Sequence, residues 1–183
     1  LAAYRGHHKR ITIVTDASPW AMGAYLVTGN TIREYTHDFV TAADAKTLGV
    51  ELGSHRAQQA FESLIVLVSM RLWKPFWFNK RVRLTVKSDS VAALSVLFKL
   101  QSRGEGPSLV ARELALDLAQ STYTPAIVEH LPGTANAIAD LLSRLGTVSQ
   151  KGPLPGIMRG ASLRICPARG VAYWRSLDPP CAR

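Results

Sequence analysis

The stretch from Ser54 to Trp73 constrains the fold most, because its apolar residues cover almost the whole circumference of a helix. Residues at helical spacing form one apolar stripe, namely Phe61, Leu64, Ile65, Val68 and Leu72. Val66, Leu67 and Met70 cover much of the remaining surface of the helix. A helix that is apolar on nearly all sides is a buried helix. Glu62 is the only charged residue between Ala57 and Met70. Burial of that carboxylate costs free energy unless it has a partner, so it is a candidate for a functional role.

Segments with strand patterns lie on both sides of this helix. They predict strands at 11–15, 24–27, 31–35, 82–87 and 126–129, the second and third joined by a turn at Gly29. Helical patterns predict further helices at 91–100, 108–121 and within 130–145, whereas residues 40–54 have a mixed pattern and are predicted to be a connection. Strands that alternate with helices late in a chain indicate an α/β domain. We therefore expect a mixed five-stranded sheet with helices packed on it.

Charge and proline divide the chain into a body and a tail. The net charge is +9, and residues 146–183 contribute six Lys and Arg against one Asp, together with five of the ten prolines. We interpret residues 1–9 as a linker from a preceding region, 10–145 as the domain, and 146–183 as a basic tail that is disordered or a linker. The two cysteines, Cys166 and Cys181, match no zinc-binding spacing, so we expect a reducing, intracellular setting, cytoplasmic or nuclear. No apolar run approaches the ~18 residues of a membrane span.

Four of the thirteen acidic residues occupy positions at which a carboxylate is costly. Asp16 and Asp89 end predicted strands, Glu62 lies in the apolar helix, and Asp140 lies in the last helix. Sites in open sheets with parallel strands gather at the carboxyl ends of the strands. A carboxylate cluster without cysteine suits the hard cations Mg²⁺ or Mn²⁺. Two such ions ~3.5–4 Å apart clamp a phosphodiester and activate water.

Each of these residues also has an explanation that involves no function. Asp16 and Asp89 could be turn or cap residues at strand ends, and Glu62 could be half exposed on a helix edge. Asp140 alone could lie on a solvated helix face. The combination of all four positions is what favours a site.

Four segments resemble the type 1 ribonuclease H domain in the form carried by retroelement reverse transcriptases. The segments are TDASPWAMGAYL (15–26), FESLIVLVSMRLW (61–73), VKSDSVAAL (86–94) and EHLPGTANAIADLLSRL (129–145). The last is the most specific, because His130 and Asn136 precede Asp140 by the ten and four positions that the family motif has. The resemblance covers roughly residues 10–145 and implies a ribonuclease H-like fold.

The resemblance implies a metal-dependent endonuclease that cuts the RNA strand of an RNA–DNA hybrid. Asp16, Glu62, Asp89 and Asp140 would hold two Mg²⁺ or Mn²⁺ ions, and His130 would assist proton transfer or product release. The hybrid would be recognised by its shape and its 2′-hydroxyls, with Lys and Arg on phosphates. Asn136, Ser90 and Lys87 are the candidate substrate-binding residues. Asn136 and Ser90 could instead be helix caps, and His130 could be a loop residue without a role.

Two departures and two alternatives stay open. Ala21 replaces a glycine that members often have, and the connection at 99–108 is too short for the extra basic helix of many cellular members. That shortness resembles retroelement domains, so we expect a covalently linked reverse transcriptase in a retrotransposon polyprotein. The main alternative is a catalytically silent connection module that binds hybrid for a polymerase. The second alternative, an unrelated phosphatase of mixed-sheet fold with Asp16 as nucleophile, explains neither the position of Glu62 nor the closing motif at 129–145.

Overall fold

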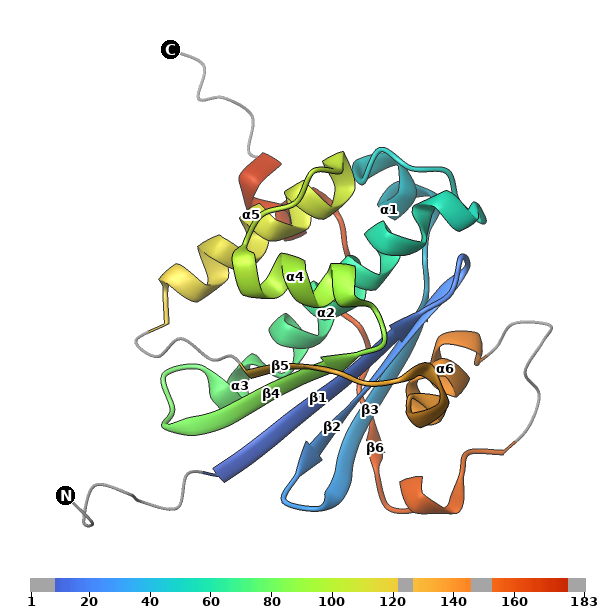
Figure 1. The fold of residues 1–183 in the computed structure, drawn as a ribbon, viewed down its shortest axis with the longest axis vertical. Helices are drawn as coiled ribbons and strands as arrows, with labels where there is room; N and C mark the ends of the chain where they lie inside the picture. Colours follow the sequence, from blue (N-terminus) through green and yellow to red (C-terminus); the bar gives the residue numbers. More distant parts are fainter. Residues whose placement is uncertain (1–8, 122–126, 146–152, 178–183) are drawn as a thin grey trace.

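The computed structural model describes residues 9–121, 127–145 and 153–177, and these form a six-stranded mixed sheet with helices on both faces (Figure 1). The strand order is β5-β4-β1-β2-β3-β6. Strands β1, β2 and β3 pair antiparallel, whereas the β1–β4, β4–β5 and β3–β6 pairs are parallel. The strands are β1 (Lys9–Ala17), β2 (Ala21–Thr28), β3 (Thr31–Phe39), β4 (Val82–Ser88), β5 (Ile127–His130) and β6 (Ser162–Leu163).

The hairpin between β2 and β3 forms where the sequence predicts a turn. Thr28 pairs with Thr31, so only Gly29 and Asn30 remain in the loop. Gly29 has a φ of +66°, which glycine adopts without the steric cost of a Cβ atom. Two-residue loops of this kind match the twist of the flanking strands, so this turn sets the register next to it. The register then shifts at an irregularity between Leu26 and Val27.

The main helix layer covers one face of the sheet, with the apolar helix at its centre. Helix α2 (Gln58–Leu72) packs against β1 and β2 on one side and against α4 (Val91–Lys99) and α5 (Glu105–Ala119) on the other. This placement explains its nearly uniform apolar surface, because Phe61, Leu64 and Leu67 are all fully buried. The layer is completed by α1 (Ala42–Thr47) and α3 (Lys74–Trp77).

Of the α-helices in the described residues, only α6 (Ala137–Arg144) covers the opposite face, where it packs on β1, β2 and β3 (Figure 1). Successive side chains of a strand point to opposite faces. Ile11 and Ile13 of β1 accordingly join the core under α2, whereas Val14 joins a second core with Leu142 of α6. Asp16 lies two residues beyond Val14, so its carboxylate points to the α6 face.

Most predicted elements are present, with a few differences at boundaries. Helix α1 lies within 40–54, where we predicted only a connection; a capping box between Thr41 and Asp44 starts this helix, and its six residues are too short for a visible apolar period. Helix α5 begins at Glu105 instead of near residue 108. Residue 126, predicted to start the last strand, lies outside the described residues. No helix in the described part of the chain is long and apolar enough to cross a membrane.

The prediction that residues 146–183 are disordered or a linker is wrong for 153–177. This segment pairs β6 with the edge of β3, and it buries Trp174 against the main core. Arg169 is only 5% exposed and binds Asp44 through Nε and Nη2, at 2.9 and 3.0 Å, and Asp38 through Nη1, at 2.7 Å. The segment is fixed by single anchoring residues, so it has no repeating apolar period for sequence analysis to detect.

We expect Arg169→Met to destabilise the domain by about 3–5 kcal/mol, because it leaves the buried Asp44 carboxylate without its counter-charge. Arg159→Met is a matched control, since Arg159 is exposed on the same segment, and it should change the free energy of unfolding by less than about 0.5 kcal/mol. Denaturant unfolding of the three proteins measures both effects. Equal stability of the two variants would show that the segment is not anchored to the domain in solution.

Candidate functional site

The carboxyl ends of the two central parallel strands bring Asp16 and Asp89 to the same edge of the sheet. β1 and β4 run parallel, with Val14 beside Lys87 in the register. Asp16 lies two residues after Val14 on β1, and Asp89 lies two residues after Lys87 on β4, so the two aspartates end up side by side. This arrangement confirms the predicted proximity of the two strand ends.

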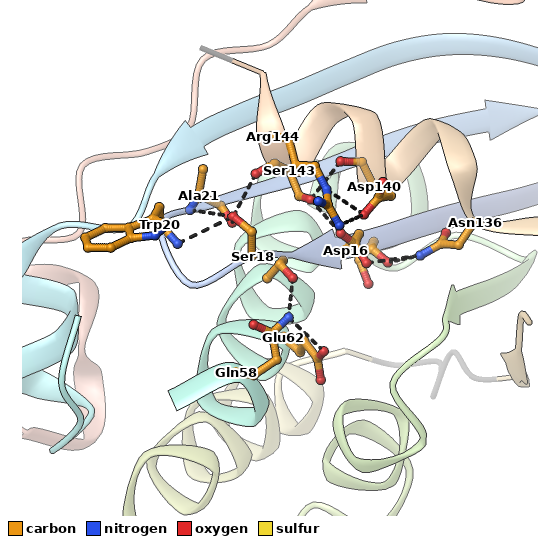
Figure 2. A network of polar contacts seen from close by, with 12 residues as sticks. Asp16, Ser18, Trp20, Ala21, Gln58, Glu62, Asn136, Asp140, Ser143 and Arg144 are labelled. Carbon is orange, nitrogen blue, oxygen red and sulfur yellow. Dashed lines mark hydrogen bonds and ion pairs between the residues drawn. The ribbon is translucent and has the colours of Figure 1, made fainter. Parts of the chain in front are cut away.

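Asp16 is almost fully buried, and both of its oxygens have partners from α6 and the turn before it. Ser143 Oγ donates to Oδ2 at 2.5 Å, and Asn136 Nδ2 donates to Oδ1 at 3.3 Å (Figure 2). Asn136 Nδ2 also lies 3.3 Å from the carbonyl oxygen of Thr15. The Asn136 side chain makes no capping bond to α6, so the structure disfavours the interpretation that it is only an N-cap.

Glu62 faces the same region from the first half of α2. Its Oε1 accepts a hydrogen bond from Gln58 Nε2 at 3.1 Å, and the same amide binds the carbonyl of Ala17 at the end of β1 (Figure 2). Burial raises the pKa of Glu62, hydrogen bonds from Ser90 and Gln58 oppose this, and the charge of Asp89 adds to it. Ser90 also caps α4 by accepting from Ala93 N, so it has a structural role as well as a contact with Glu62.

Asp89 carries an unsatisfied buried oxygen. Its Oδ1 is buried and has no hydrogen-bond partner among the described residues. Its backbone oxygen lies 3.2 Å from Nε2 of His130, which ends β5 and is exposed to solvent. The loop after β5 passes close by, because a Cβ atom at Gly133 would lie 3.6 Å from Asp89 Oδ2. A buried carboxylate oxygen without a donor is a position that a cation or a substrate hydroxyl can satisfy.

The Asp140 side chain is about half exposed, whereas Asp16 is buried. It lies in the first turn of α6, and its Oδ1 pairs with Arg144 one turn later, at 2.6 Å to Nη2 and 2.8 Å to Nε. Both side chains are about half exposed, so this ion pair contributes little to stability.

The four predicted carboxylates influence one another electrostatically. The pKa of Asp16 is raised to about 7, chiefly by burial. The hydrogen bond from Ser143 opposes this rise, and the negative charges of Asp89, Asp140 and Glu62 contribute to it. Like charges in a partly desolvated site disfavour one another's ionised forms. The structure therefore gathers Asp16, Glu62, Asp89 and Asp140 into one acidic site, with Asn136 and Ser90 in contact with it and His130 at its border.

Lys87 differs from these residues. Its ammonium pairs with Glu129 across β4 and β5, at 2.8 Å, instead of contacting the acidic site. Lys87 ends a stretch that also contains Lys74, Lys80, Arg81 and Arg83. Trp73 and Trp77 beside these basic residues are buried in the core, so they have a structural role. A substrate contact from Lys87 stays a prediction.

Sequence analysis did not single out three residues that contact the site, namely Gln58, Ser143 and Arg144. Two of them could have been found from helical spacing, because Gln58 precedes Glu62 by four residues and Arg144 follows Asp140 by four. Ser143 could not, because its contact with Asp16 joins residues that are 127 positions apart.

A divalent cation fits the chemistry of these residues. No three His, Cys, Asp or Glu side chains of the described residues are arranged to hold one metal ion as they stand. The donor set is nevertheless made of carboxylate oxygens, which Mg²⁺ and Mn²⁺ prefer. The buried Oδ1 of Asp89 has no hydrogen-bond partner among the described residues, so a cation could satisfy it. Burial is the main cause of the raised pKa of Asp16, and the nearby charges of Asp89, Asp140 and Glu62 add to it.

Comparison with known proteins identifies the fold. No family model matches the chain, and a search of curated proteins finds no match. Among solved structures, RNase H1 from the halophilic archaeon Halobacterium salinarum is similar, with 17% identity, a TM-score of 0.51, and coverage of 73% of this chain and 93% of that one. The N-terminal RNase H domain of a Mycobacterium tuberculosis protein is also similar, with 12% identity, a TM-score of 0.51, and coverage of 73% of this chain and 90% of that one.

A third similar structure is LC11-RNase H1 in complex with RNA/DNA hybrid, with 13% identity, a TM-score of 0.52, and coverage of 72% of this chain and 92% of that one. At these identities the similarity shows the fold and not the activity. The chain therefore has a ribonuclease H-like fold. The predicted α/β class is confirmed, and the sheet has six strands because β6 adds to the predicted five.

The burial of Asp16 predicts a specific pH dependence for the metal-free protein. The folded protein binds a proton on Asp16 up to about pH 7, whereas the unfolded chain releases it near 3.8, so stability should fall as the pH rises between these values. Asp16→Asn removes this effect. We expect the free energy of unfolding of the wild type, relative to the variant, to fall by about 2–4 kcal/mol from pH 4 to pH 8 in chelator. A difference that is constant with pH would contradict the raised pKa of the buried Asp16 carboxyl.

Proposed function

We propose that this chain is a divalent-cation-dependent endonuclease that hydrolyses the RNA strand of RNA–DNA hybrids. The observation that carries the proposal is the gathering of Asp16, Glu62, Asp89 and Asp140 on a ribonuclease H-like fold. The solved RNase H1 structures support the fold, and one of them is in complex with RNA/DNA hybrid. The activity of this chain is argued from its own carboxylates.

The four carboxylates would hold two Mg²⁺ or Mn²⁺ ions. Asp16 and Asp89 are central, since they lie at the ends of neighbouring strands, and Glu62 and Asp140 face them from α2 and α6. Bound divalent cations supply charge neutralisation, a lower pKa for the attacking water and polarisation of the scissile phosphate.

The residues around the carboxylates give each of them a defined position. Gln58 fixes Glu62 relative to the end of β1, because its amide contacts both Glu62 and the carbonyl of Ala17. Asn136 holds Asp16 and the backbone of Thr15 together. Positions that are fixed before the substrate binds lower the cost of reorganisation during the reaction.

His130 is placed to carry a proton at the border of the site. Its ring is exposed, and Nε2 lies beside the backbone oxygen of Asp89. An imidazole that reaches both solvent and the site suits transfer of a proton to a leaving oxygen.

The closing motif and the short connection after α4 further support an origin in a retrotransposon polyprotein with a linked reverse transcriptase.

The test is cleavage of a labelled RNA–DNA hybrid in Mg²⁺ or Mn²⁺ by the wild type and by Asp89→Asn. We expect metal-dependent cutting of the RNA strand by the wild type, and a loss of about 10²-fold or more in the variant, the scale of losing one electrostatic contact to a transition state. Glu105→Gln is a matched control, since Glu105 is an acid in the first turn of α5, outside the site. It should cleave at the wild-type rate.

Two outcomes would contradict the proposal. Equal cleavage by the wild type and Asp89→Asn would assign the activity to another site or a contaminant. Binding of the hybrid without cleavage by any protein would favour the silent connection module, because hybrid recognition needs only shape and phosphate contacts.

A further inference from the structure

We infer that Ser143 is a positioning residue of the acidic site, which holds the Asp16 carboxylate through a close approach of α6 to β2. This inference rests on the proposed function, because it assigns Ser143 a role in the same site. Neither the apolar stripe of α6 nor the motif around Asp140 requires a serine at this position. Three independent contacts support the assignment.

The first contact is the hydrogen bond itself. Ser143 is fully buried in the last turn of α6, and its hydroxyl lies 2.5 Å from Asp16 Oδ2 and 2.9 Å from the backbone oxygen of Asp140. A hydroxyl has one hydrogen, so it cannot donate to both oxygens at once. Donation to an ionised carboxylate is the stronger bond, so Ser143 donates to Asp16 when that group is charged.

The second contact is the close approach of the α6 backbone to Gly23 on β2. Gly23 of β2 is the register partner of Asp16 on β1. A Cβ atom at Gly23 would lie 2.4 Å from Leu142 Cβ and 2.5 Å from Ser143 N, so only a glycine lets the helix backbone rest here. The absent side chain thus brings Ser143 to the strand position beside Asp16.

The third contact secures the end of α6. Ser18, in the turn after β1, donates its hydroxyl to the backbone oxygen of Ser143 at 3.0 Å and also lies 3.1 Å from the oxygen of Ala21 (Figure 2). The turn that follows Asp16 is therefore tied to the residue that binds Asp16. Asn136 holds the other carboxylate oxygen from the start of the same helix.

These contacts fix the Asp16 carboxylate at both oxygens from one helix. Without the Ser143 hydroxyl, Oδ2 would lose its donor, and the carboxylate could rotate about its side-chain torsions. A cation ligand that can rotate binds its ion less tightly and places it less accurately. Substrate binding would change little, since Ser143 is buried and cannot touch a nucleic acid.

The test compares Ser143→Ala with Ser69→Ala as a matched control. Ser69 is also a fully buried helix serine, and its hydroxyl donates to the backbone oxygen of Val66 at 3.0 Å instead of to a carboxylate. Each variant loses one buried hydroxyl. A purely structural role of Ser143 would therefore give both variants similar losses in every measurement.

We expect Ser143→Ala to bind Mn²⁺ at least fivefold more weakly, measured by electron paramagnetic resonance of free Mn²⁺, and to cleave hybrid with a kcat at least tenfold lower. Its KM for the hybrid should stay within twofold of the wild type. Ser69→Ala should match the wild type in all three values. Mn²⁺ affinity and kcat of Ser143→Ala within twofold of the wild type would overturn the inference.

The two readouts separate this inference from the proposed function. If the wild type binds Mn²⁺ but cuts no hybrid, the nuclease proposal fails, and the Mn²⁺ affinities of the two variants still decide the role of Ser143. If the wild type neither binds Mn²⁺ nor cuts hybrid, both the function and the positioning role are overturned.

Discussion

The structure depends on one costly feature, the burial of the Asp16 carboxylate where the central strand ends beneath α6. Desolvation, together with the charges of three further carboxylates, raises the pKa of this group to about 7. A domain accepts such a cost only when nearby donors or a ligand compensate it. Ser143 and Asn136 provide part of this compensation by donating to the two oxygens of the carboxylate. Under the proposed function, a bound divalent cation would provide the rest.

The sequence was sufficient to predict most of the fold and the acidic residues of the site. Periodicity located the sheet strands before β6 and the long helices, and the ends of β1 and β4 identified Asp16 and Asp89 because parallel neighbours end at the same edge. Glu62 was visible as a single charge in an apolar helix. These signals are local in the chain, so they need no knowledge of tertiary contacts.

Other features could not be predicted, because they come from contacts between distant residues. Arg169 anchors the segment 153–177 to Asp44, and Ser143 reaches Asp16 across more than 120 positions. Neither contact produces a repeating pattern or a characteristic short spacing in the sequence from which it could be predicted. The basic composition and prolines of the tail instead resemble those of a disordered segment, and one arginine that pairs with a buried acid reverses this interpretation.

Fold and site give different levels of support for the function. The solved RNase H1 structures share only 12–17% of their residues with this chain, so they establish the ribonuclease H-like architecture alone. The case for a nuclease depends on the carboxylates and on the residues that hold them. The added strand β6 pairs with β3 and lies at that edge of the sheet.

The most direct test of this account is a carbon-13 NMR titration of the aspartate carboxyl groups, with and without saturating Mg²⁺. The account predicts one carboxyl, assigned to Asp16 by its loss in Asp16→Asn, that titrates near pH 7 in metal-free protein. Its apparent pKa should fall when Mg²⁺ is added, because a bound cation favours the ionised form. If Asp16 instead titrates near pH 4 and Mg²⁺ has no effect, the acidic site is not a cation site and the central claim is wrong.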